Sequence, residues 1–450
     1  MRPRLTGMIV ALLLGLGLML GAAASRAAPP PPNFVVLLCD DLGYGDLGCF
    51  GNRVIRTPNL DRLATQGLKL TSCYAGAPVC SPSRSALQTG RAPQRERIFD
   101  WIPLHSPMHL AQGAPTLASA LKGVGYQTCA VGKWHLTGVL DGRQPMPNEH
   151  GYDHYFVTQN NALPSHHDPV NFVRDGRPVG PLRGNSATLT VNEALGWLKQ
   201  RDRRRPFLLY VAFHAPHEPI ATDERFVKMY PEAMPRNRAI YYGNVSQMDD
   251  EAGRLLRYLD EAGLRRNTAV LFTSDNGPET LNRYRGAARS YGSPGELRGM
   301  KLWLYEGGIR IPGIVRWPGV THPGRVSDEP VSGVDWLPTL AHAAGARLPA
   351  SRRLDGSDAR PILRGGRRIQ RRRPLFWIYQ RALGNPKAAL RDGDWKLLAD
   401  ADFQQLELYN LADDRREIQD LAAAYPRRVR RMARRLRGLL SELPKPPAGR

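Results

Sequence analysis

Short apolar runs along this chain alternate with longer segments in which apolar residues recur three or four positions apart. The short runs are rich in β-branched residues, have the length of buried strands, and cover residues 33–38, 126–131, 206–213 and 268–274. The longer segments have the spacing of amphipathic helices and cover residues 57–66, 116–122, 190–199 and 237–262. This alternation predicts an α/β fold with a large, mostly parallel sheet sandwiched by helices.

The start of the first of these helices carries a clear local signal. Thr57 is followed directly by Pro58. A threonine side chain can cap the free amides at a helix start, and proline fits the first helical turn. We therefore expect Thr57 to cap this helix.

The pattern changes after a Gly- and Arg-rich stretch at residues 365–373, which we interpret as a linker. Short strand-like runs follow at residues 376–379, 388–390, 395–398 and 406–409. Asp392-Gly393 lies between two of these runs and is typical of a hairpin turn, and a final helix is expected at residues 426–443. We predict a large domain over residues 28–370 and a small C-terminal α+β domain, an antiparallel sheet with one helix, over residues 371–450.

The first 27 residues have the features of a signal peptide. Arg2 and Arg4 form a basic start, residues 8–20 are apolar, and Ser25-Arg26-Ala27 is a suitable cleavage site. The apolar run is short for a membrane span, although an uncleaved N-terminal anchor is the alternative. We therefore expect an exported protein, periplasmic or secreted, with no stable membrane insertion.

The formal net charge of +22 favours polyanionic partners through long-range attraction. Nucleic acid and sulfated polysaccharide both meet this criterion, and the charge alone does not separate them. Seven arginines lie between Arg427 and Arg437, beside an apolar stripe at helical spacing formed by Val429, Met432, Leu436 and Leu440. This basic amphipathic helix either packs on the small sheet or binds a polyanionic glycan or a membrane surface.

Acidic residues directly follow two of the predicted strands. Asp40 and Asp41 follow the first, and Asp275 and Asn276 follow the strand at residues 268–274. The carboxyl ends of parallel strands meet at one edge of a sheet, where ligands gather. Each pair alone would be read as a loop cap, but together they predict an all-oxygen site suited to Ca²⁺ or Mg²⁺ rather than zinc. The five cysteines, of which Cys80 is one, include no Cys-x-x-Cys zinc motif, and their spacing does not determine a disulfide pairing.

Three further segments place basic side chains near predicted strand ends. They are Gly132-Lys133-Trp134-His135, the run 213–219 with His214 and His217, and Lys301 ahead of the Gly-rich run 305–312. Taken singly, lysines and histidines of this kind are more often solvated or structural than catalytic.

The run from Cys80 to Arg91, Cys-Ser-Pro-Ser-Arg-Ser-Ala-Leu-Gln-Thr-Gly-Arg, is the most specific motif in the chain. It resembles the signature of the formylglycine-dependent sulfatases, and the resemblance extends over most of residues 33–370. The alternative is a helix start built from small residues with a buried cysteine. The resemblance implies an alkaline-phosphatase-like fold and a sulfuric ester hydrolase.

The same resemblance implies a role for each candidate residue. A maturation enzyme would oxidise Cys80 to formylglycine, whose hydrate attacks sulfur, and Arg84 would orient it. One Ca²⁺ would be held by Asp40, Asp41, Asp275 and Asn276. Lys133, His217 and Lys301 would bind the substrate sulfate, with His217 favoured over His214, and His135 would take the proton that triggers sulfate release. Gln159, Asn160 or Asn161 would supply a further polar contact.

Two other functions compete with a sulfatase acting on a sulfated carbohydrate. The first is a phosphomonoester, phosphodiester or phosphonate hydrolase of the same superfold. The second is a basic exported protein that binds acidic glycans without catalysis. The motif from Cys80 onwards favours the sulfatase, with no nucleic acid among its partners. Substrate specificity is expected on the loops 99–112, 164–185 and 280–295.

Overall fold

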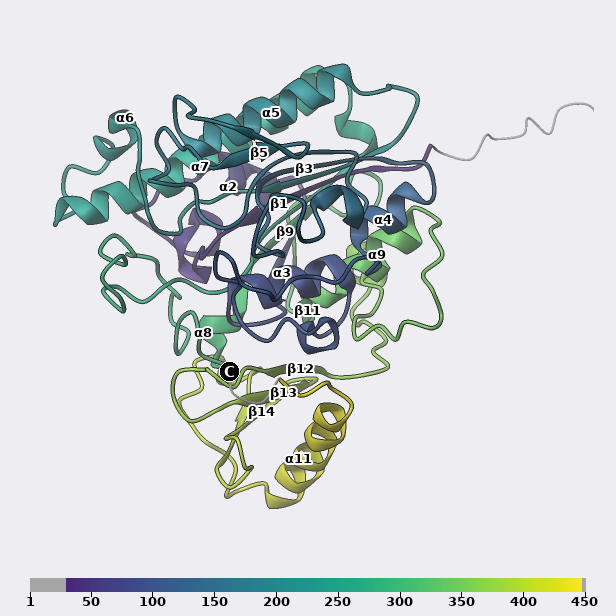
Figure 1. Ribbon diagram of the computed structural model, residues 1–450. Helices are drawn as coiled ribbons and strands as arrows, with labels where there is room; N and C mark the ends of the chain where they lie inside the picture. The colour runs from purple at the N-terminus through teal and green to yellow at the C-terminus, as the bar shows by residue number, and fades with distance from the viewer. Residues whose placement is uncertain (1–29, 447–450) are drawn as a thin grey trace, which may run out of the picture. The chain divides into compact units, whose positions relative to one another are not determined.

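The computed structural model describes residues 30–446 (Figure 1). The predicted signal peptide, residues 1–27, lies outside the described residues. Within the described part of the chain, no helix combines the length and the apolar character needed to cross a membrane.

An eleven-stranded mixed sheet forms the centre of residues 32–446, in the strand order β10-β2-β9-β8-β1-β7-β3-β4-β5-β6, with β11 paired to β2. The strands of this sheet are β1 Asn33–Cys39, β2 Leu68–Tyr74, β3 Gln127–Lys133, β4 His154–Thr158, β5 Phe172–Arg174, β6 Arg177–Val179, β7 Phe207–Ala212, β8 Thr268–Ser274, β9 Arg310–Arg316, β10 Arg325–Ser327 and β11 Val331–Ser332. The middle strands β8, β1, β7, β3 and β4 run parallel. The predicted α/β fold with a mostly parallel sheet is confirmed.

The central strands are apolar on both faces because helices cover both sides of the sheet. All seven residues of β1 are buried. Its odd-numbered side chains, Val35 and Leu37, pack in one core with residues of α2, α5 and α7. The even-numbered Phe34, Val36 and Leu38 pack in a second core with residues of α4 and α9. Figure 1 shows these two helical layers on either side of the sheet.

Five helices lie close to the segments predicted at residues 57–66, 116–122, 190–199, 237–262 and 426–443, while the helices over residues 224–227, 306–309, 336–343 and 360–363 were not predicted. Their bounds are α2 Pro58–Thr65, α3 Cys80–Thr89, α4 Leu117–Lys122, α5 Ser186–Gln200, α6 Glu224–Val227, α7 Arg236–Glu261, α8 Glu306–Ile309, α9 Trp336–Ala343, α10 Arg360–Leu363 and α11 Pro426–Ser441. Short 3₁₀ turns are η1 Tyr44–Asp46, η2 Gly48–Phe50, η3 Pro93–Glu96, η4 Pro147–His150, η5 Arg265–Asn267 and η6 Gly333–Asp335.

The expected cap of α2 is wrong in one respect. Thr57 occupies the N-cap position, but its side chain makes no capping hydrogen bond. The buried carboxylate of Asp249, from α7, instead accepts from the backbone amides of Asn59 and Leu60 at 3.1 and 2.8 Å. The Thr57 hydroxyl donates to Asp61. A residue of a neighbouring helix has therefore taken the capping role.

The predicted small antiparallel sheet is confirmed, in the strand order β12-β13-β14-β15. Its strands are β12 Leu375–Ile378, β13 Ala388–Asp392, β14 Trp395–Ala399 and β15 Leu406–Asn410. Asp392 pairs with Trp395 across the predicted hairpin turn, and Gly393 has a φ of 62°, which glycine adopts without strain. Residues 32–446 form one unit, and the domain boundary at residue 370 stays a prediction.

Candidate active site

The four predicted metal-binding residues lie together at adjacent strand ends. β1 and β8 pair in parallel with Cys39 opposite Ser274, so the residues that follow each strand are neighbours. The Asp41 amide donates to Asp275 Oδ1 at 3.1 Å, and Asn276 Nδ2 donates to Asp41 Oδ1 at 2.7 Å. Asp40, Asp41, Asp275 and Asn276 are all buried. The fold therefore places three carboxylates and an amide in one small volume.

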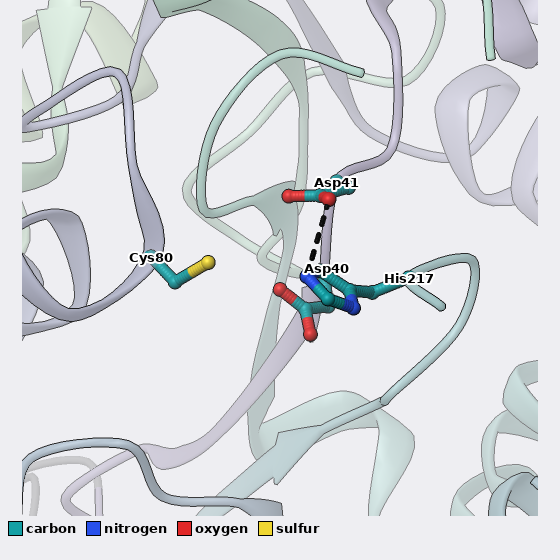
Figure 2. A group of neighbouring side chains, drawn as sticks. All are labelled: Asp40, Asp41, Cys80 and His217. Carbon is teal, nitrogen blue, oxygen red and sulfur yellow. Dashed lines mark ion pairs between the residues drawn. The ribbon is translucent and has the colours of Figure 1, made fainter. Parts of the chain in front are cut away.

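Cys80 faces this acidic group from the start of α3. Ligand atoms of Asp40, Asp41, Cys80 and His217 all lie within 4.8 Å of one another. Figure 2 shows the Cys80 thiol pointing toward the two aspartates, with His217 on their other side. Burial raises the pKa of this thiol to about 12, so it is neutral near pH 7 and a poor nucleophile in its unmodified form.

The rest of the Cys80 motif positions this residue. The Ser81 hydroxyl accepts from the Ile102 amide at 3.0 Å, and the Ser83 hydroxyl accepts from the Gly76 amide at 3.2 Å. Gly90 ends α3 with a φ of 67° and donates its amide to the Ala86 carbonyl, an arrangement that favours glycine. Both serine hydroxyls therefore have a structural role.

Three cations pair with the three carboxylates. Lys133 Nζ lies 2.7 Å from Asp40 Oδ2, and Lys301 Nζ lies 2.7 Å from Asp41 Oδ2. Arg84 Nη2 lies 2.8 Å from Asp275 Oδ2, while Arg84 Nη1 donates to the Lys133 carbonyl at 2.8 Å. Since every member is buried, each charge depends on its partner, and removing any one would leave an uncompensated charge. Arg84 Nη2 also lies 3.5 Å from Asp40 Oδ1, so its guanidinium group contacts Asp40, Asp275 and the Lys133 carbonyl. The role predicted for Arg84 in orienting residue 80 stays a prediction.

The donor set fits a hard cation such as Ca²⁺. Burial and the neighbouring carboxylates raise the pKa of Asp41 to about 6 and that of Asp275 to about 7. A bound cation would therefore stabilise the ionised form of these carboxylates. The buried Asn276 Oδ1 has no hydrogen-bond partner among residues 30–446 and is free to act as a ligand. Carboxylate and amide oxygens are the donors that Ca²⁺ prefers.

The two candidate histidines of the 213–219 segment have different surroundings in the structure. His217 Nε2 lies 3.5 Å from Asp41 Oδ2, the contact dashed in Figure 2, while Nδ1 lies 2.5 Å from the Glu218 carbonyl. Burial lowers the pKa of His217 to about 3. His214 Nε2 instead bonds Thr158 Oγ1 at 2.7 Å, and its ring packs on Phe172. His217 therefore belongs to the site, and His214 is structural.

His135 lies beside the site with a defined hydrogen-bonding pattern. Its Nε2 lies 3.1 Å from the Ile102 carbonyl, which can only accept, so Nε2 carries the proton. The buried Nδ1 has no hydrogen-bond partner within residues 30–446 and holds a free lone pair. Burial, with the nearby Lys133 and Arg84, keeps the pKa of His135 well below its usual value. The imidazole is therefore a neutral base.

Of the three polar candidates downstream of His135, Gln159 is the one held next to that histidine. Its carbonyl accepts from the His135 amide at 2.8 Å, and its side-chain amide donates to the Ile102 and Thr137 carbonyls. Within residues 30–446, no side-chain hydrogen bond links Asn160 or Asn161 to the predicted metal-binding residues. The role predicted for these three positions stays a prediction.

The sequence analysis did not identify Glu279. Its carboxylate lies 3.8 Å from Lys301 Nζ and pairs with Arg283 at 2.7 Å. Lys301 is thus shared between Asp41 and Glu279. The position of Glu279 three residues after Asn276, on the same strand-end loop, is the signal that could have pointed to it.

Comparisons with known proteins agree with this geometry. The Sulfatase family matches residues 32–346, and the family "N-sulphoglucosamine sulphohydrolase, C-terminal" matches residues 299–444. Human arylsulfatase A is 36% identical over 389 residues, covering 80% of this chain and 73% of that protein. Mouse steryl-sulfatase is 34% identical over 452 residues, covering 81% and 70%.

A solved structure extends the similarity to the fold. The crystal structure of Ps i-CgsB in complex with k-i-k-neocarrahexaose aligns with a TM-score of 0.82 and 27% identity, over 93% of this chain and 94% of that one. Together with the buried carboxylates facing Cys80, these matches establish what the chain is. It belongs to the sulfatase family and is a sulfuric ester hydrolase.

Proposed function

We propose that this sulfatase hydrolyses sulfate monoesters of a carbohydrate, using formylglycine made from Cys80 by a maturation enzyme, and one Ca²⁺. The observation that carries the proposal is the placement of Cys80 within 4.8 Å of Asp40, Asp41 and His217, inside a buried cluster of paired charges. Support for a carbohydrate comes from Ps i-CgsB, which was solved with a neocarrahexaose.

The two groups that the protein would acquire supply complementary chemistry. Formylglycine supplies, as its hydrate, a hydroxyl nucleophile in place of a thiol whose pKa is about 12. Ca²⁺, held by Asp40, Asp41, Asp275 and Asn276, supplies positive charge that stabilises developing negative charge.

The remaining residues bind and move protons. Lys133 brings an ammonium group to Asp40 and Lys301 brings one to Asp41, where both can hold sulfate oxygens. Lys301 and His217 both contact Asp41 Oδ2, so we assign them to the leaving-group side. His135, neutral and with Nδ1 free, accepts the proton whose loss releases sulfate. Arg84 holds Asp275 and the Lys133 backbone in position.

A substrate panel tests this function. Purified protein from a host with the maturation enzyme is assayed on sulfated mono- and oligosaccharides, an aryl sulfate, a steroid sulfate, and phosphate and phosphonate esters. We expect turnover of at least one sulfated sugar, and Cys80→Ala should lower it by on the order of 10⁴-fold or more. Preferential hydrolysis of a phosphoester, or of the steroid sulfate over every sugar, would overturn the proposal.

We also propose that the protein is exported, on the basis of the predicted signal peptide at residues 1–27. N-terminal sequencing of protein recovered from its native cells should begin after Ala27. A mature chain that retains Met1 would contradict export by cleavage.

A further inference from the structure

Helix α11 has two opposite faces with different environments. Its buried residues Val429, Met432, Ala433, Leu436 and Leu439 pack against residues of β13, β14 and β15, on one face of the small sheet. The other face of the same sheet packs against the cluster that contains Cys80. α11, drawn in yellow in Figure 1, therefore lies on the side of the small sheet away from the active site.

Four arginines form the opposite face of α11, which we call the arginine face: Arg427, Arg430, Arg431 and Arg434. Their spacing of three or four residues aligns them along one side of the helix, over about 10 Å of its axis. All four are exposed, and none of their side chains forms an ion pair or a hydrogen bond within residues 30–446.

The other three arginines of α11 have partners. Arg435 pairs with Asp392 at 2.7 Å, Arg428 lies over the Trp395 ring at 4.0 Å, and Arg437 lies over the Phe403 ring at 4.7 Å. The arginines on the flanks of the helix thus form an ion pair or cation–π contacts, whereas the side chains of the arginine face have no such partners within residues 30–446.

The arginine face is unfavourable for the helix itself. Arg427 and Arg431 are four residues apart, as are Arg430 and Arg434, and like charges at this spacing repel. Arg427 also lies in the first turn, where the helix dipole disfavours a cation, and that turn contains no acidic residue. A bound polyanion would relieve both effects, and its regularly spaced negative charges would complement the row of guanidinium groups.

A membrane surface fits this face poorly. A helix that lies in a membrane buries its apolar side in lipid, but the apolar side of α11 is already buried against the small sheet. Only charge remains exposed on the arginine face.

We propose that the arginine face binds a sulfated glycan chain, at a second site separate from the catalytic centre. The choice of a sulfated glycan over other polyanions rests on the proposed function, because one chain could then carry both the bound sulfates and the ester to be cleaved. Binding at this site would raise the local concentration of that ester near Cys80.

Binding to heparin, used as a sulfated glycan probe, tests the proposal without requiring turnover. The variant Arg427→Gln/Arg430→Gln/Arg431→Gln/Arg434→Gln should bind heparin roughly tenfold or more weakly at 0.15 M salt and show a shallower salt dependence. The four corresponding Arg→Lys changes should retain most of the binding. Turnover of a small sulfate ester should be unchanged in both variants.

A matched control separates this face from overall charge. Arg53, Arg177, Arg203 and Arg266 are exposed and have no ion pair within residues 30–446, and changing all four to Gln removes the same charge elsewhere. This control should keep its heparin affinity within about twofold. The double variants Arg427→Gln/Arg430→Gln and Arg431→Gln/Arg434→Gln, checked by circular dichroism, repeat the test with smaller changes.

The proposal would be overturned if the arginine-face and control variants lost heparin affinity equally. It would also be overturned if neither variant lost heparin affinity. Duplex DNA or phosphatidylserine vesicles binding as tightly as heparin, through the same arginines at the same salt concentration, would overturn the assignment to a sulfated glycan. Failure of the sulfatase assay would leave the heparin result intact, so the two proposals fail separately.

Discussion

His135 illustrates how surroundings fix the chemistry of a single residue. The protonated Nε2 donates a hydrogen bond to the Ile102 carbonyl, and burial keeps the ring neutral. Nδ1 therefore has a free lone pair and can act as a base. His135→Ala should reduce steady-state turnover roughly 10²- to 10⁴-fold, the usual contribution of a general base. Because the base is assigned to sulfate release, rapid-quench experiments should still show a burst of alcohol product in the first turnover.

His214→Ala serves as the matched control for His135. It removes a buried imidazole that contacts Thr158 and Phe172, so thermal stability should fall without producing a burst. Loss of the burst in His135→Ala would mean that His135 acts before the first bond is broken, and its role would pass to another residue.

At the residue scale, the sequence predicted which side chains would come together, because they lie at strand ends. Asp40, Asp41, Asp275 and Asn276 each follow a predicted strand, and parallel pairing of β1 and β8 brings them together. Glu279 was not predicted, because its role depends on Lys301, which reaches it from a loop more than twenty positions away. The tautomer of His135 also depends on a distant carbonyl, that of Ile102.

At the scale of secondary-structure elements, the start of α2 is held by a helix far away in sequence. Asp249 of α7 accepts hydrogen bonds from the Asn59 and Leu60 amides and from the Asn59 side chain. Asp249→Ala should therefore reduce the free energy of unfolding by about 2–4 kcal/mol, since it removes a cap and leaves buried amides unpaired. Chemical denaturation would measure this loss.

The neighbouring Asp250→Ala is the control for Asp249. Within residues 30–446, the Asp250 side chain pairs only with Arg225, at 3.7 Å on the surface. This change should therefore reduce the free energy of unfolding only slightly. Equal losses for the two variants would show that the Asp249 bonds do not cap α2.

A buried ion network links the small sheet to α8, which follows Lys301 in the chain. Lys396 of β14 lies 2.9 Å from Glu306 and 2.8 Å from Glu417, and the Glu306 amide donates to Glu417 at 2.7 Å. Burial and the nearby Glu306 raise the pKa of Glu417 to about 7, against the attraction of Lys396. Burial also acts on Glu306, but Lys396, Arg310 and Arg391 outweigh it, and the Glu306 pKa falls to about 2.

This network predicts a stability that changes with pH. The raised pKa of Glu417 means that the folded state holds its proton up to about pH 7, while the unfolded state releases it near pH 4.3. The resulting stabilisation is complete below about pH 4 and is lost as pH rises through 7. Between pH 5 and pH 8, the free energy of unfolding of the natural protein should therefore fall by on the order of 2–3 kcal/mol relative to that of Glu417→Gln.

Urea unfolding at several pH values would measure this difference. Glu306 stays ionised over that pH range, so it does not contribute to the change of the free energy of unfolding with pH. Glu261→Gln, at an exposed position, is the control and should follow the natural protein at every pH. A pH-independent difference between the natural protein and Glu417→Gln would show that Glu417 ionises normally when folded.

Several elements were not predicted from the sequence, among them β2, β4 and α9, and β9 is one that breaks the apolar pattern. β1, β7 and β8 were predicted because they are continuous apolar runs. β9 lies between β2 and β8 but contains Arg310, Pro312 and Arg316. Arg310 is buried beside Glu306, and the Pro312 carbonyl accepts from the Thr273 hydroxyl, contacts that only the folded chain creates. β3 also extends through Lys133, which the sequence placed after the strand.

At the scale of the whole molecule, the acidic centre should couple metal binding to stability. Asp40, Asp41 and Asp275 come from two strands of the central sheet, so a bound Ca²⁺ would hold both strand ends together. Adding Ca²⁺ to chelator-treated protein at about 100 times its Kd should raise the free energy of unfolding by about 2.7 kcal/mol. Asp275→Asn should weaken this effect, and Asp250→Asn, at a partly exposed position, should not.

Elemental analysis completes the metal test. One calcium per chain is expected in active protein. Stoichiometric zinc, or full activity in protein that contains no metal, would contradict the proposed calcium site.

The most direct test of the account compares residue 80 with turnover in the same preparations. The protein is produced with graded amounts of the maturation enzyme, and peptide mass spectrometry measures the fraction of residue 80 that carries an aldehyde in place of the thiol. Sulfate ester hydrolysis per mole of protein should rise in proportion to that fraction and approach zero when the thiol is intact. Full turnover by protein with an unmodified Cys80 would contradict the proposed mechanism.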